Sequence, residues 1–324
     1  MTRLAVVIVN YRTPALAVEA LASLATELDP ARDRAVVVDN DSGDGSAEHL
    51  EREIENRGFQ AWARVVRSPE NGGFSAGNNV GMRAEPASFH LLLNSDAHVR
   101  PGAVAELLRA AEAHPEAGIV SPRLEWPDGT PQVSCFRDRS PISEVIEAAG
   151  TSVVTRLLGR WDVPLPVSDV PFEPPWTSFA CVLLRRELVE AVGEMDDGYF
   201  MYFDDIDYCR RARAAGYAVL HWPAARVVHL RGGSSPVKTE RAARRRPPPY
   251  YYEARARYFA KFYGRAGLVA TNLLWGLGRT ISGLRESVGH KQAHTCEGEE
   301  RDIWLRWRDP LRPLALALDE GKEV

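Results

Sequence analysis

The chain has 324 residues, of which 45% are hydrophobic and 26% charged, and its formal net charge is −4 at pH 7. This composition is that of a soluble globular protein; it excludes a disordered chain and disfavours a generic nucleic-acid binder, which would be basic. The length suffices for one large domain or two moderate ones. We therefore expect a folded protein without a nucleic-acid partner.

The cysteines and the apolar stretches indicate the compartment. Four cysteines lie far apart and form no CxxC or Cys/His pattern: Cys135, Cys181, Cys209 and Cys296. This spacing favours free thiols in a reducing compartment over disulfides or a zinc site. The N-terminal "MTRLAVVIVNYRTP" lacks a signal-peptide architecture, and "GLVATNLLWGLG" is shorter than the about 20 residues that span a bilayer. We expect a cytoplasmic protein that contacts a membrane at most peripherally.

The first part of the chain alternates continuous apolar runs with amphipathic segments. The runs predict buried strands at 4–10, 35–40, 63–68, 90–96 and 117–124, and the amphipathic segments predict helices at 14–28, 47–56 and 101–115. Repeated strand–helix units connect parallel strands. The sequence therefore predicts an α/β fold with a Rossmann-like, mostly parallel sheet flanked by helices.

The second part is less regular. The Asp-Gly pair in "WPDGTPQVS" predicts a local hairpin, and the Pro-rich "VPLPVSDVPFEPPW" predicts an irregular flap that ends at Trp176. A strand leading into a helix is predicted from "SFACVLLRRELVEAVG", and another strand from "AVLHWPAARVVHL". After residue 235 the chain is basic and aromatic, and we expect a helical extension.

Polar residues follow the predicted strands at their carboxyl ends, where open parallel sheets bind ligands. The first strand ends in Asn10-Tyr11 and the second in Asp39. No G-x-G-x-x-G follows the first strand, which disfavours a dehydrogenase-type dinucleotide site. Tyr11 could stack on a base and Asp39 could accept hydrogen bonds from a base or ribose. The alternatives are a rim aromatic for Tyr11 and a turn cap for Asp39.

A Gly-rich loop, "NGGFSAGNN", runs into a predicted helix. The backbone N–H groups around Asn71, Gly72 and Gly73 could bind a diphosphate, and the side chains of Asn78 and Asn79 could position a sugar. The alternative is a tight turn before a capped helix.

The fourth strand ends in Asn94-Ser95-Asp96. A carboxylate at that position is a suitable hard ligand for Mg²⁺ or Mn²⁺, with phosphate oxygens of a substrate completing the shell. His229, at the end of "ARVVHL", could supply another ligand, although a lone histidine is more often a structural hydrogen-bonding residue.

"FMYFDDIDYC" places three carboxylates, those of Asp204, Asp205 and Asp207, among apolar side chains. Apolar residues follow at helical spacing, so the carboxylates are predicted in a first helical turn, where the helix dipole favours their charged form. One interpretation is an acidic helix cap and the other is a site that meets a cation or a proton donor. Asp207 is expected to cap the helix or to face solvent.

Six blocks of the sequence, in this order, resemble family 2 glycosyltransferases, and most closely their bacterial rhamnosyltransferase-like branch. The resemblance covers residues 3 to 265. The blocks are "VIVNYR", "VVVDNDSGDGS", "NGGFSAGNNVG", "LLLNSDA", "FMYFDDIDYCRRARAAGY" and "VVHLRGGSS". The resemblance implies a GT-A fold and a metal-dependent, inverting transfer of a sugar from a nucleotide-diphosphate donor.

Residue roles follow from the matching positions. The resemblance assigns Asn10, Tyr11 and Asp39 to the nucleotide. It also assigns donor binding to a second set: Asn71, Gly72, Gly73, Asn78, Asn94 and Asp96. Asp96 ends the family's metal-binding DXD block, here Asn94-Ser95-Asp96, and His229 matches a histidine that completes the metal or diphosphate site in several relatives. Asp205 matches the general base, while Asp204 and Trp176 are assigned to the acceptor side.

The resemblance also implies an organisation of the chain. Residues 1–235 would form the catalytic domain, with a nucleotide-sugar half at 1–125 and an acceptor half at 126–235. Residues 236–324 would form a basic, aromatic helical extension, and its part 236–285 would contact anionic lipid or a lipid-linked acceptor.

The resemblance to the rhamnosyltransferase-like branch is the only basis for predicting the substrates. The expected donor is dTDP-L-rhamnose, with UDP sugars as the alternative, and the expected acceptor is a hydroxyl of a glycan or a polyprenyl-diphosphate-linked sugar in cell-envelope polysaccharide synthesis. Competing classes are a sugar nucleotidyltransferase, which would need a basic Gly-rich loop after the first strand, and a non-catalytic nucleotide-sugar-binding subunit.

Overall fold

The computed structural model describes residues 2–231, 237–289 and 294–313. Two compact units make up the chain. The first consists of residues 1–136, 166–197 and 204–234, and the second of residues 137–165, 198–203 and 235–324. The end of the motif "VVHLRGGSS" and the predicted domain boundary at 235 lie outside the described residues.

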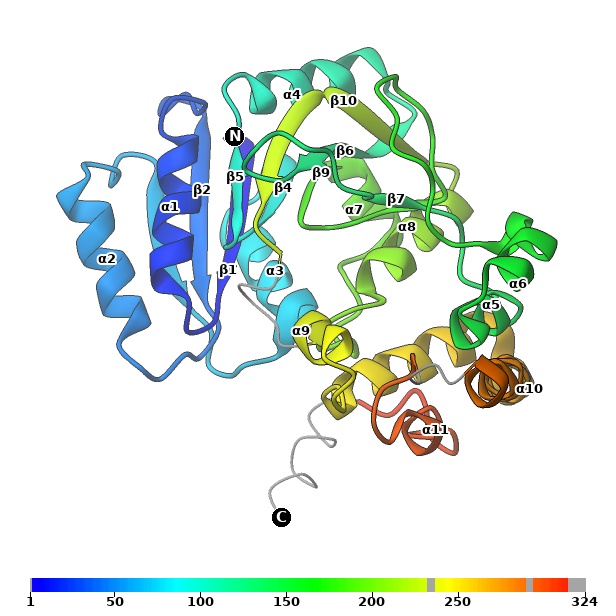
Figure 1. Cartoon of the computed structure of the whole chain (residues 1–324). Helices are drawn as coiled ribbons and strands as arrows, with labels where there is room; N and C mark the ends of the chain where they lie inside the picture. Colours follow the sequence, from blue (N-terminus) through cyan, green and yellow to red (C-terminus); the bar gives the residue numbers. More distant parts are fainter. Residues whose placement is uncertain (1, 232–236, 290–293, 314–324) are drawn as a thin grey trace. The chain divides into compact units, whose positions relative to one another are not determined.

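The first unit is built on an eight-stranded sheet with the order β3-β2-β1-β4-β9-β6-β10-β5 (Figure 1). The strands are β1 (Thr2–Asn10), β2 (Asp33–Asp39), β3 (Ala63–Arg67), β4 (Ala87–Asn94), β5 (Ala97–Val99), β6 (Ala117–Glu125), β9 (Cys181–Arg185) and β10 (Ala218–His229). β9 runs antiparallel to both of its neighbours and β5 antiparallel to β10, while the other pairs are parallel. The predicted Rossmann-like, mostly parallel sheet is therefore confirmed.

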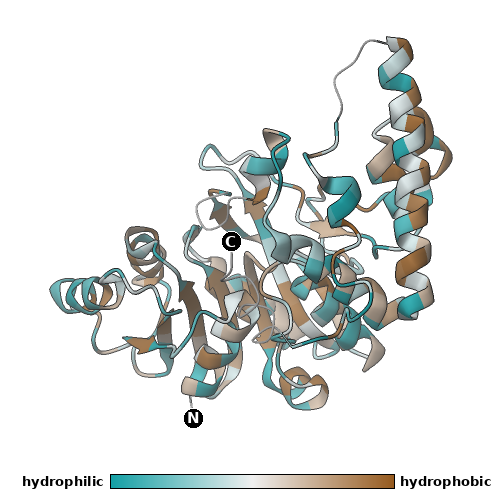
Figure 2. Cartoon of the chain, turned by 90° about the horizontal axis from the view of Figure 1, so that it is seen from below, coloured by the Kyte–Doolittle hydropathy of each residue, from teal (hydrophilic) through white to brown (hydrophobic). Residues whose placement is uncertain are grey.

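Helices cover this sheet because the strand residues alternate between its faces. The helices of this unit are α1 (Pro14–Leu24), α2 (Ser46–Asn56), α3 (Gly73–Ala84), α4 (Ala103–Ala113), α7 (Arg186–Val192) and α8 (Asp204–Ala214). Leu4, Val6 and Ile8 of β1 join the core cluster that includes the buried residues of α1 and α4. Figure 2 shows the apolar residues concentrated in the strands.

α3 packs very closely against the other face of β1, which carries Val7 and Val9. A Cβ on Gly81 would lie 2.3 Å from a Val7 methyl carbon, and one on Gly77 would lie 2.8 Å from a methyl carbon of Val9. Only glycine leaves room for such an approach, so these two positions fix where the Gly-rich segment meets the sheet.

The predicted hairpin in "WPDGTPQVS" is present as a tight turn. The N–H of Trp126 donates to the Thr130 carbonyl at 2.8 Å, and Glu125 forms an antiparallel bridge with Pro131. Beyond it, β7 (Cys135–Phe136) pairs with β8 (Trp176–Thr177), which follows the Pro-rich segment.

The second unit is helical, as predicted for the C-terminal extension. It contains α5 (Ser143–Ala149), α6 (Ser152–Leu157), the short 3₁₀ helix η1 (Gly159–Trp161), α9 (Val237–Ala242), α10 (Pro249–Gly289) and α11 (Glu299–Asp302). α10 is broken at Gly264, whose φ of 70° and ψ of 174° are not helical. Among the described residues, no helix combines the length and apolar character needed to cross a bilayer.

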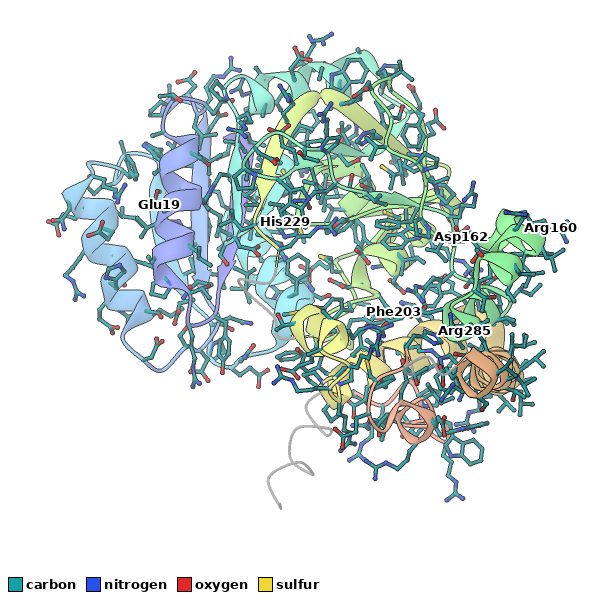
Figure 3. The ribbon with its side chains drawn as sticks, viewed as in Figure 1. Glu19, Arg160, Asp162, Phe203, His229 and Arg285 are labelled. Carbon is teal, nitrogen blue, oxygen red and sulfur yellow. The ribbon has the colours of Figure 1, made fainter. Side chains whose placement is uncertain are left out.

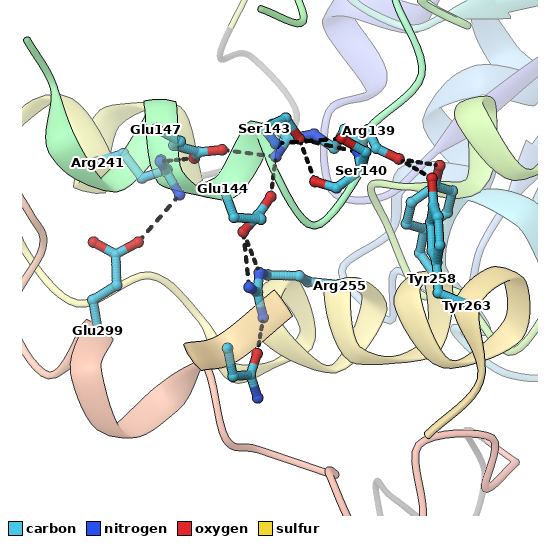
Figure 4. A network of polar contacts seen from close by, with 11 residues as sticks. Arg139, Ser140, Ser143, Glu144, Glu147, Arg241, Arg255, Tyr258, Tyr263 and Glu299 are labelled. Carbon is cyan, nitrogen blue, oxygen red and sulfur yellow. Dashed lines mark hydrogen bonds and ion pairs between the residues drawn. The ribbon is translucent and has the colours of Figure 1, made fainter. Parts of the chain in front are cut away.

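Buried ion pairs hold the helices of the second unit together (Figure 4). Glu144 of α5 accepts from Arg139 at 3.1 Å and from Arg255 of α10 at 2.8 Å. Glu147 accepts from Arg139 and from Arg241 of α9, both at 2.7 Å. Each of these carboxylates meets two guanidinium groups, so neither is left as an uncompensated charge.

Candidate active site

The ends of β1 and β2 are joined through Asp39. Its Oδ1 accepts from Asn10 Nδ2 at 2.8 Å and from Ser42 Oγ at 2.6 Å, and its Oδ2 accepts from the Ser42 N–H at 3.3 Å. Asn10 Oδ1 in turn accepts from the N–H of Thr13 at 3.2 Å. Asn10 and Asp39 are both buried. Asp39 therefore caps the turn that follows β2, which is the structural role given above as the alternative to nucleotide binding.

Tyr11 lies next to this cluster and is 41% exposed. The Arg12 guanidinium carbon lies 5.1 Å from the centre of the Tyr11 ring, and Arg12 adopts a left-handed φ of 57°. The ring is therefore accessible for stacking, which the proposed contact with a base requires.

The Gly-rich loop is tied to the end of β2 through Asn40. The Asn40 Nδ2 group donates to Asn71 Oδ1 at 2.8 Å and to the Gly73 carbonyl at 3.1 Å. The N–H of Gly73 donates to Asn71 Oδ1, and that of Gly72 to the Glu70 carbonyl, each at 3.1 Å. These two N–H groups are thus used within the loop.

The two asparagines on α3 both have protein partners. Asn78 Nδ2 donates to the Phe74 carbonyl at 2.9 Å, one helical turn back. Asn79 exchanges two hydrogen bonds with the backbone of Met195, at 2.9 and 3.0 Å. Asn79 therefore joins α3 to the segment before α8, which is a structural use of a side chain expected to contact sugar.

Asp96 and His229 lie together although they are far apart in the sequence. β5 pairs with β10 so that Ala97 faces His229, and the Leu230 N–H donates to the Asp96 carbonyl at 3.0 Å. The His229 Nε2 atom lies 3.4 Å from Asp96 Oδ1, and both side chains are buried. Figure 3 shows His229 at the end of β10.

This pair fits one end of a divalent-cation site. The buried Oδ1 of Asn94 and Nδ1 of His229 have no hydrogen-bond partner among the described residues. Within the same residues, no group of three or more His, Cys, Asp or Glu side chains assembles to hold a metal. One carboxylate and one imidazole therefore suit a cation whose remaining ligands come from a substrate.

Gln132 and Arg231 border this pair and carry no sequence signal. Gln132 Nε2 donates to the His229 carbonyl at 2.7 Å, and its Oε1 accepts from Arg231 Nε at 2.5 Å. Arg231 adopts a left-handed φ of 52°, and its guanidinium carbon lies 5.7 Å from the Trp126 ring centre. The hairpin thus holds the chain where it leaves β10.

The acidic cluster opens α8, as predicted from its spacing. Tyr202 and Phe203, which precede it, both adopt left-handed φ values, of 72° and 62°. Asp204 is buried and Asp205 is partly exposed. Asp207 does not face solvent, which was one of the two expectations for it: it is fully buried and accepts from Arg211 Nε at 2.8 Å, one turn further along the helix.

Among the described residues, no such arginine partner is found for Asp204. Burial, together with the charge of the adjacent Asp205, raises the pKa of Asp204 well above its usual value. The environment of Asp204 therefore disfavours its charged form, while the neighbouring Asp205 is partly exposed. A partly exposed carboxylate is accessible to a proton-donating ligand.

Trp176, expected on the acceptor side, is 9% exposed and stacks on Phe136 with ring centres 4.2 Å apart. It lies on β8, against which α8 packs. The strand that carries Trp176 therefore supports the helix that carries the acidic pair.

The chain is similar to known glycosyltransferases. N-acetylglucosaminyl-diphospho-decaprenol L-rhamnosyltransferase of Mycobacterium tuberculosis is 29% identical over 216 residues, which cover 62% of this chain and 67% of that protein. The low-salt glycan biosynthesis hexosyltransferase of Haloferax volcanii is 26% identical over 46% of this chain and 45% of its own length.

Solved structures share the fold at low identity. A Pyrobaculum calidifontis mannosyltransferase in complex with GDP-Man and Mn²⁺ superposes with a TM-score of 0.56 at 16% identity, covering 99% of this chain and 87% of that one. GalNAc-T7 with UDP, GalNAc and Mn²⁺ gives a TM-score of 0.57 at 16% identity, but this chain covers 59% of its length. Both are GT-A glycosyltransferases, so the expected GT-A fold is confirmed.

The family model described as "Glycosyltransferase like family 2" matches residues 2–246. This match covers most of the chain and includes the strand ends, the Gly-rich loop and the acidic pair. The chain therefore belongs to the family 2 glycosyltransferases and is an enzyme of that class.

Proposed function

We propose that this enzyme transfers a sugar, with inversion, from a nucleotide-diphosphate donor to a hydroxyl of a glycan or a polyprenyl-diphosphate-linked acceptor. The donor we favour is dTDP-L-rhamnose, because the Mycobacterium tuberculosis relative is an L-rhamnosyltransferase that acts on a decaprenyl-diphosphate-linked sugar. The cellular process would be the synthesis of cell-envelope polysaccharide. The observation that carries the proposal is the pairing of Asp96 with His229 in the unit that also holds Asp204 and Asp205.

The donor would bind along the carboxyl ends of β1, β2 and β4. Tyr11 would stack on the base, and Asp39 would meet the nucleoside while Asn10 and Ser42 hold its carboxylate in place. Asn71, Gly72 and Gly73 would shape the loop beside the diphosphate, and Asn78 the turn of α3 that follows.

Asp96 and His229 would hold Mg²⁺ or Mn²⁺ together with diphosphate oxygens, and Asn94 would lie beside them. A divalent cation bound there supplies positive charge that stabilises the departing nucleotide diphosphate. Gln132 fixes the backbone of His229 and so would keep the imidazole oriented toward that position.

Asp205 would act as the general base. Its carboxylate would take the proton of the acceptor hydroxyl as that oxygen bonds to the anomeric carbon and the bond from that carbon to the diphosphate oxygen breaks. Asp204, with its raised pKa, would stay neutral on the acceptor side and could donate a hydrogen bond to the incoming sugar. Trp176 would back this region from β8.

The test is a panel of nucleotide sugars with the purified chain and Mn²⁺, measured by nucleotide release and by thermal shift. Release and stabilisation with dTDP-L-rhamnose are expected. A response to UDP sugars alone would replace the donor, and binding without any turnover on a panel of acceptors would favour a non-catalytic sugar-binding subunit.

The metal assignment has its own test. Asp96→Asn and His229→Ala should each weaken Mn²⁺ binding in the presence of nucleoside diphosphate, about tenfold or more, measured by calorimetry without turnover. Asp128→Asn, an exposed carboxylate in the same unit, is the matched control. Unchanged Mn²⁺ affinity in both site variants would remove the metal assignment and leave the family membership intact.

A further inference from the structure

Exposed apolar side chains gather in the second unit. Six of them lie on α6 and α10: Val153 (66% exposed), Leu157 (77%), Leu273 (62%), Leu277 (53%), Leu284 (64%) and Val288 (84%). We call this set the α6–α10 face. A contiguous group of large apolar side chains in contact with water indicates a surface that another phase or molecule covers.

The four residues on α10 form one stripe. They are spaced by four, seven and four residues after Leu273, which at 100° per residue places them within about 60° of one another around the helix. Figure 2 shows apolar segments recurring along this long helix. Val153 and Leu157 are also four residues apart and so lie on one side of α6.

Packing inside the unit fixes the direction of this stripe. A Cβ on Gly278 would lie 2.6 Å from the Val145 carbonyl oxygen, so α10 presses against α5 there with no side chain between them. The Arg285 Nη1 group donates to the Gly150 carbonyl at 2.8 Å, just before α6 begins. α10 therefore cannot rotate to bury the stripe, and its outer part lies beside α6.

The charges around the face are basic. Arg156, Arg160 and Arg265 are exposed, and Figure 3 shows Arg160 and Arg285 on this unit. In residues 265–289 the only acidic side chain is Glu286, which pairs with Arg279 at 3.0 Å. Apolar stripes flanked by arginine are typical of helices that lie in the interface of an anionic bilayer.

Three arginines that precede α10 have acidic partners within the second unit. Arg241 pairs with Glu147 at 2.7 Å, and Arg246 pairs with Asp302 at 2.6 Å. Arg245 pairs with Glu240 at 2.6 Å. Carboxylates of the same unit thus offset these three charges, although the Arg245 side chain is 62% exposed, and the further exposed arginines lie on α6, η1 and the second half of α10.

We propose that the α6–α10 face docks the enzyme onto the surface of an anionic lipid bilayer, with its leucines and valines among the acyl chains and its arginines at the headgroups. A second copy of this chain fits the face less well. In a twofold dimer the same patch meets itself, which would bring like-charged arginines together. An anionic bilayer meets the same arginines with opposite charge.

Flotation of the full chain with vesicles tests the proposal. Binding is expected to vesicles of phosphatidylcholine mixed with phosphatidylglycerol, and much less to phosphatidylcholine alone. The double variant Leu277→Asp/Leu284→Asp should bind these vesicles at least about tenfold more weakly, because two exposed apolar side chains become charged. Arg156→Glu/Arg160→Glu should reduce binding to the anionic vesicles and leave weak binding to neutral ones unchanged.

The matched control is Val167→Asp/Val170→Asp, which changes two exposed valines of the first unit. It should bind vesicles like the unmodified chain, and circular dichroism should show all variants folded. Absence of vesicle binding by the unmodified chain, or full binding by Leu277→Asp/Leu284→Asp, would overturn the proposal. So would a dimer in light scattering that only this double variant dissociates. No sugar donor is present, so the result is independent of the proposed transferase reaction.

Discussion

Two groups of buried or half-buried carboxylates in this protein have opposite surroundings. In the second unit, Glu144 and Glu147 are each bound by two arginines. In the first unit, Asp204 is buried beside another carboxylate, that of Asp205, and lies three residues before Asp207, which accepts from Arg211. Burial alone would raise the pKa of Glu147, but the charges of Arg139 and Arg241 lower it below its usual range, whereas the pKa of Asp204 is raised.

This difference distinguishes carboxylates that stabilise the fold from carboxylates that serve a reaction. A buried carboxylate that meets two guanidinium groups gains from its ionised state and stabilises the helices around it. A buried carboxylate next to another one makes the native state less stable when both are ionised, and such a cost is found where a site needs a proton acceptor or donor.

Asp205→Asn should have the largest effect. Without the carboxylate that accepts the hydroxyl proton, turnover should fall by about 10²–10⁴-fold, while nucleotide binding stays within about twofold because the amide keeps the size of the side chain. Nucleotide release and calorimetry measure the two quantities. Asp128→Asn, an exposed carboxylate on the hairpin, should keep full activity; an active Asp205→Asn enzyme would require another base.

Glu147→Gln should destabilise the chain by about 3 kcal/mol, since Arg139 and Arg241 would each lose a charged partner. Because the pKa of Glu147 is lowered in the folded state, its stabilisation is present above the unfolded-state pKa and is lost as the pH falls through and below it. The difference in melting temperature between the variant and the unmodified chain should therefore shrink in acid. Glu297→Gln, an exposed glutamate in the same unit, should leave the melting temperature unchanged at every pH.

Asp204→Asn should act in the opposite direction. Its pKa is raised in the folded state, so the native protein holds a proton that the unfolded chain releases, and stability decreases as the pH rises above the unfolded-state pKa. Replacing the ionisable carboxyl group by an amide removes this pH-dependent loss and should raise stability at neutral pH by about 1–2 kcal/mol, seen as a higher melting temperature.

Asp207→Asn is the contrast on the same helix turn. It leaves Arg211 without its charged partner and should lower the melting temperature. Equal shifts for the Asp204 and Asp207 variants would mean that the two carboxylates do not differ in compensation.

Tyr11→Ala should have the smallest effect. Loss of ring stacking should weaken nucleotide affinity by about three- to tenfold without changing stability, since the ring is 41% exposed. Calorimetry with the nucleoside diphosphate measures this affinity. Tyr217→Ala, on the loop after α8, is the control substitution of another tyrosine. An unchanged affinity would remove Tyr11 from the nucleotide site.

Local patterns predicted most of the elements. The apolar runs predicted β1, β2 and β4, and the helical spacing of Ile206, Cys209 and Ala212 predicted that the acidic cluster lies in a first helical turn, which is that of α8. Because side-chain period and strand length are local properties, a sequence states them directly. The helix predicted at 14–28 ends at Leu24, since helix termini depend on weaker signals.

The tertiary structure determines which polar groups form hydrogen bonds and ion pairs with one another. The meeting of Asp96 with His229 requires the pairing of β5 with β10, and the link from Gln132 to His229 requires the hairpin to fold beside that strand. Asp204 and Asp207 are both buried, but only for Asp207 do the described residues include an arginine partner, Arg211. Both residues are aspartates, so the residue type does not distinguish them. The distance of each carboxylate from opposite charge and from water determines its ionisation.

The sequence by itself thus determined the family, the strand–helix order and the residue types at the strand ends, because these depend on short segments. The tertiary structure determined which of those residues touch and which ions are balanced. It also left the stripe on α10 outward, because Gly278 presses the opposite side of that helix onto α5. Contacts between distant segments are fixed by packing, and no single segment carries that information.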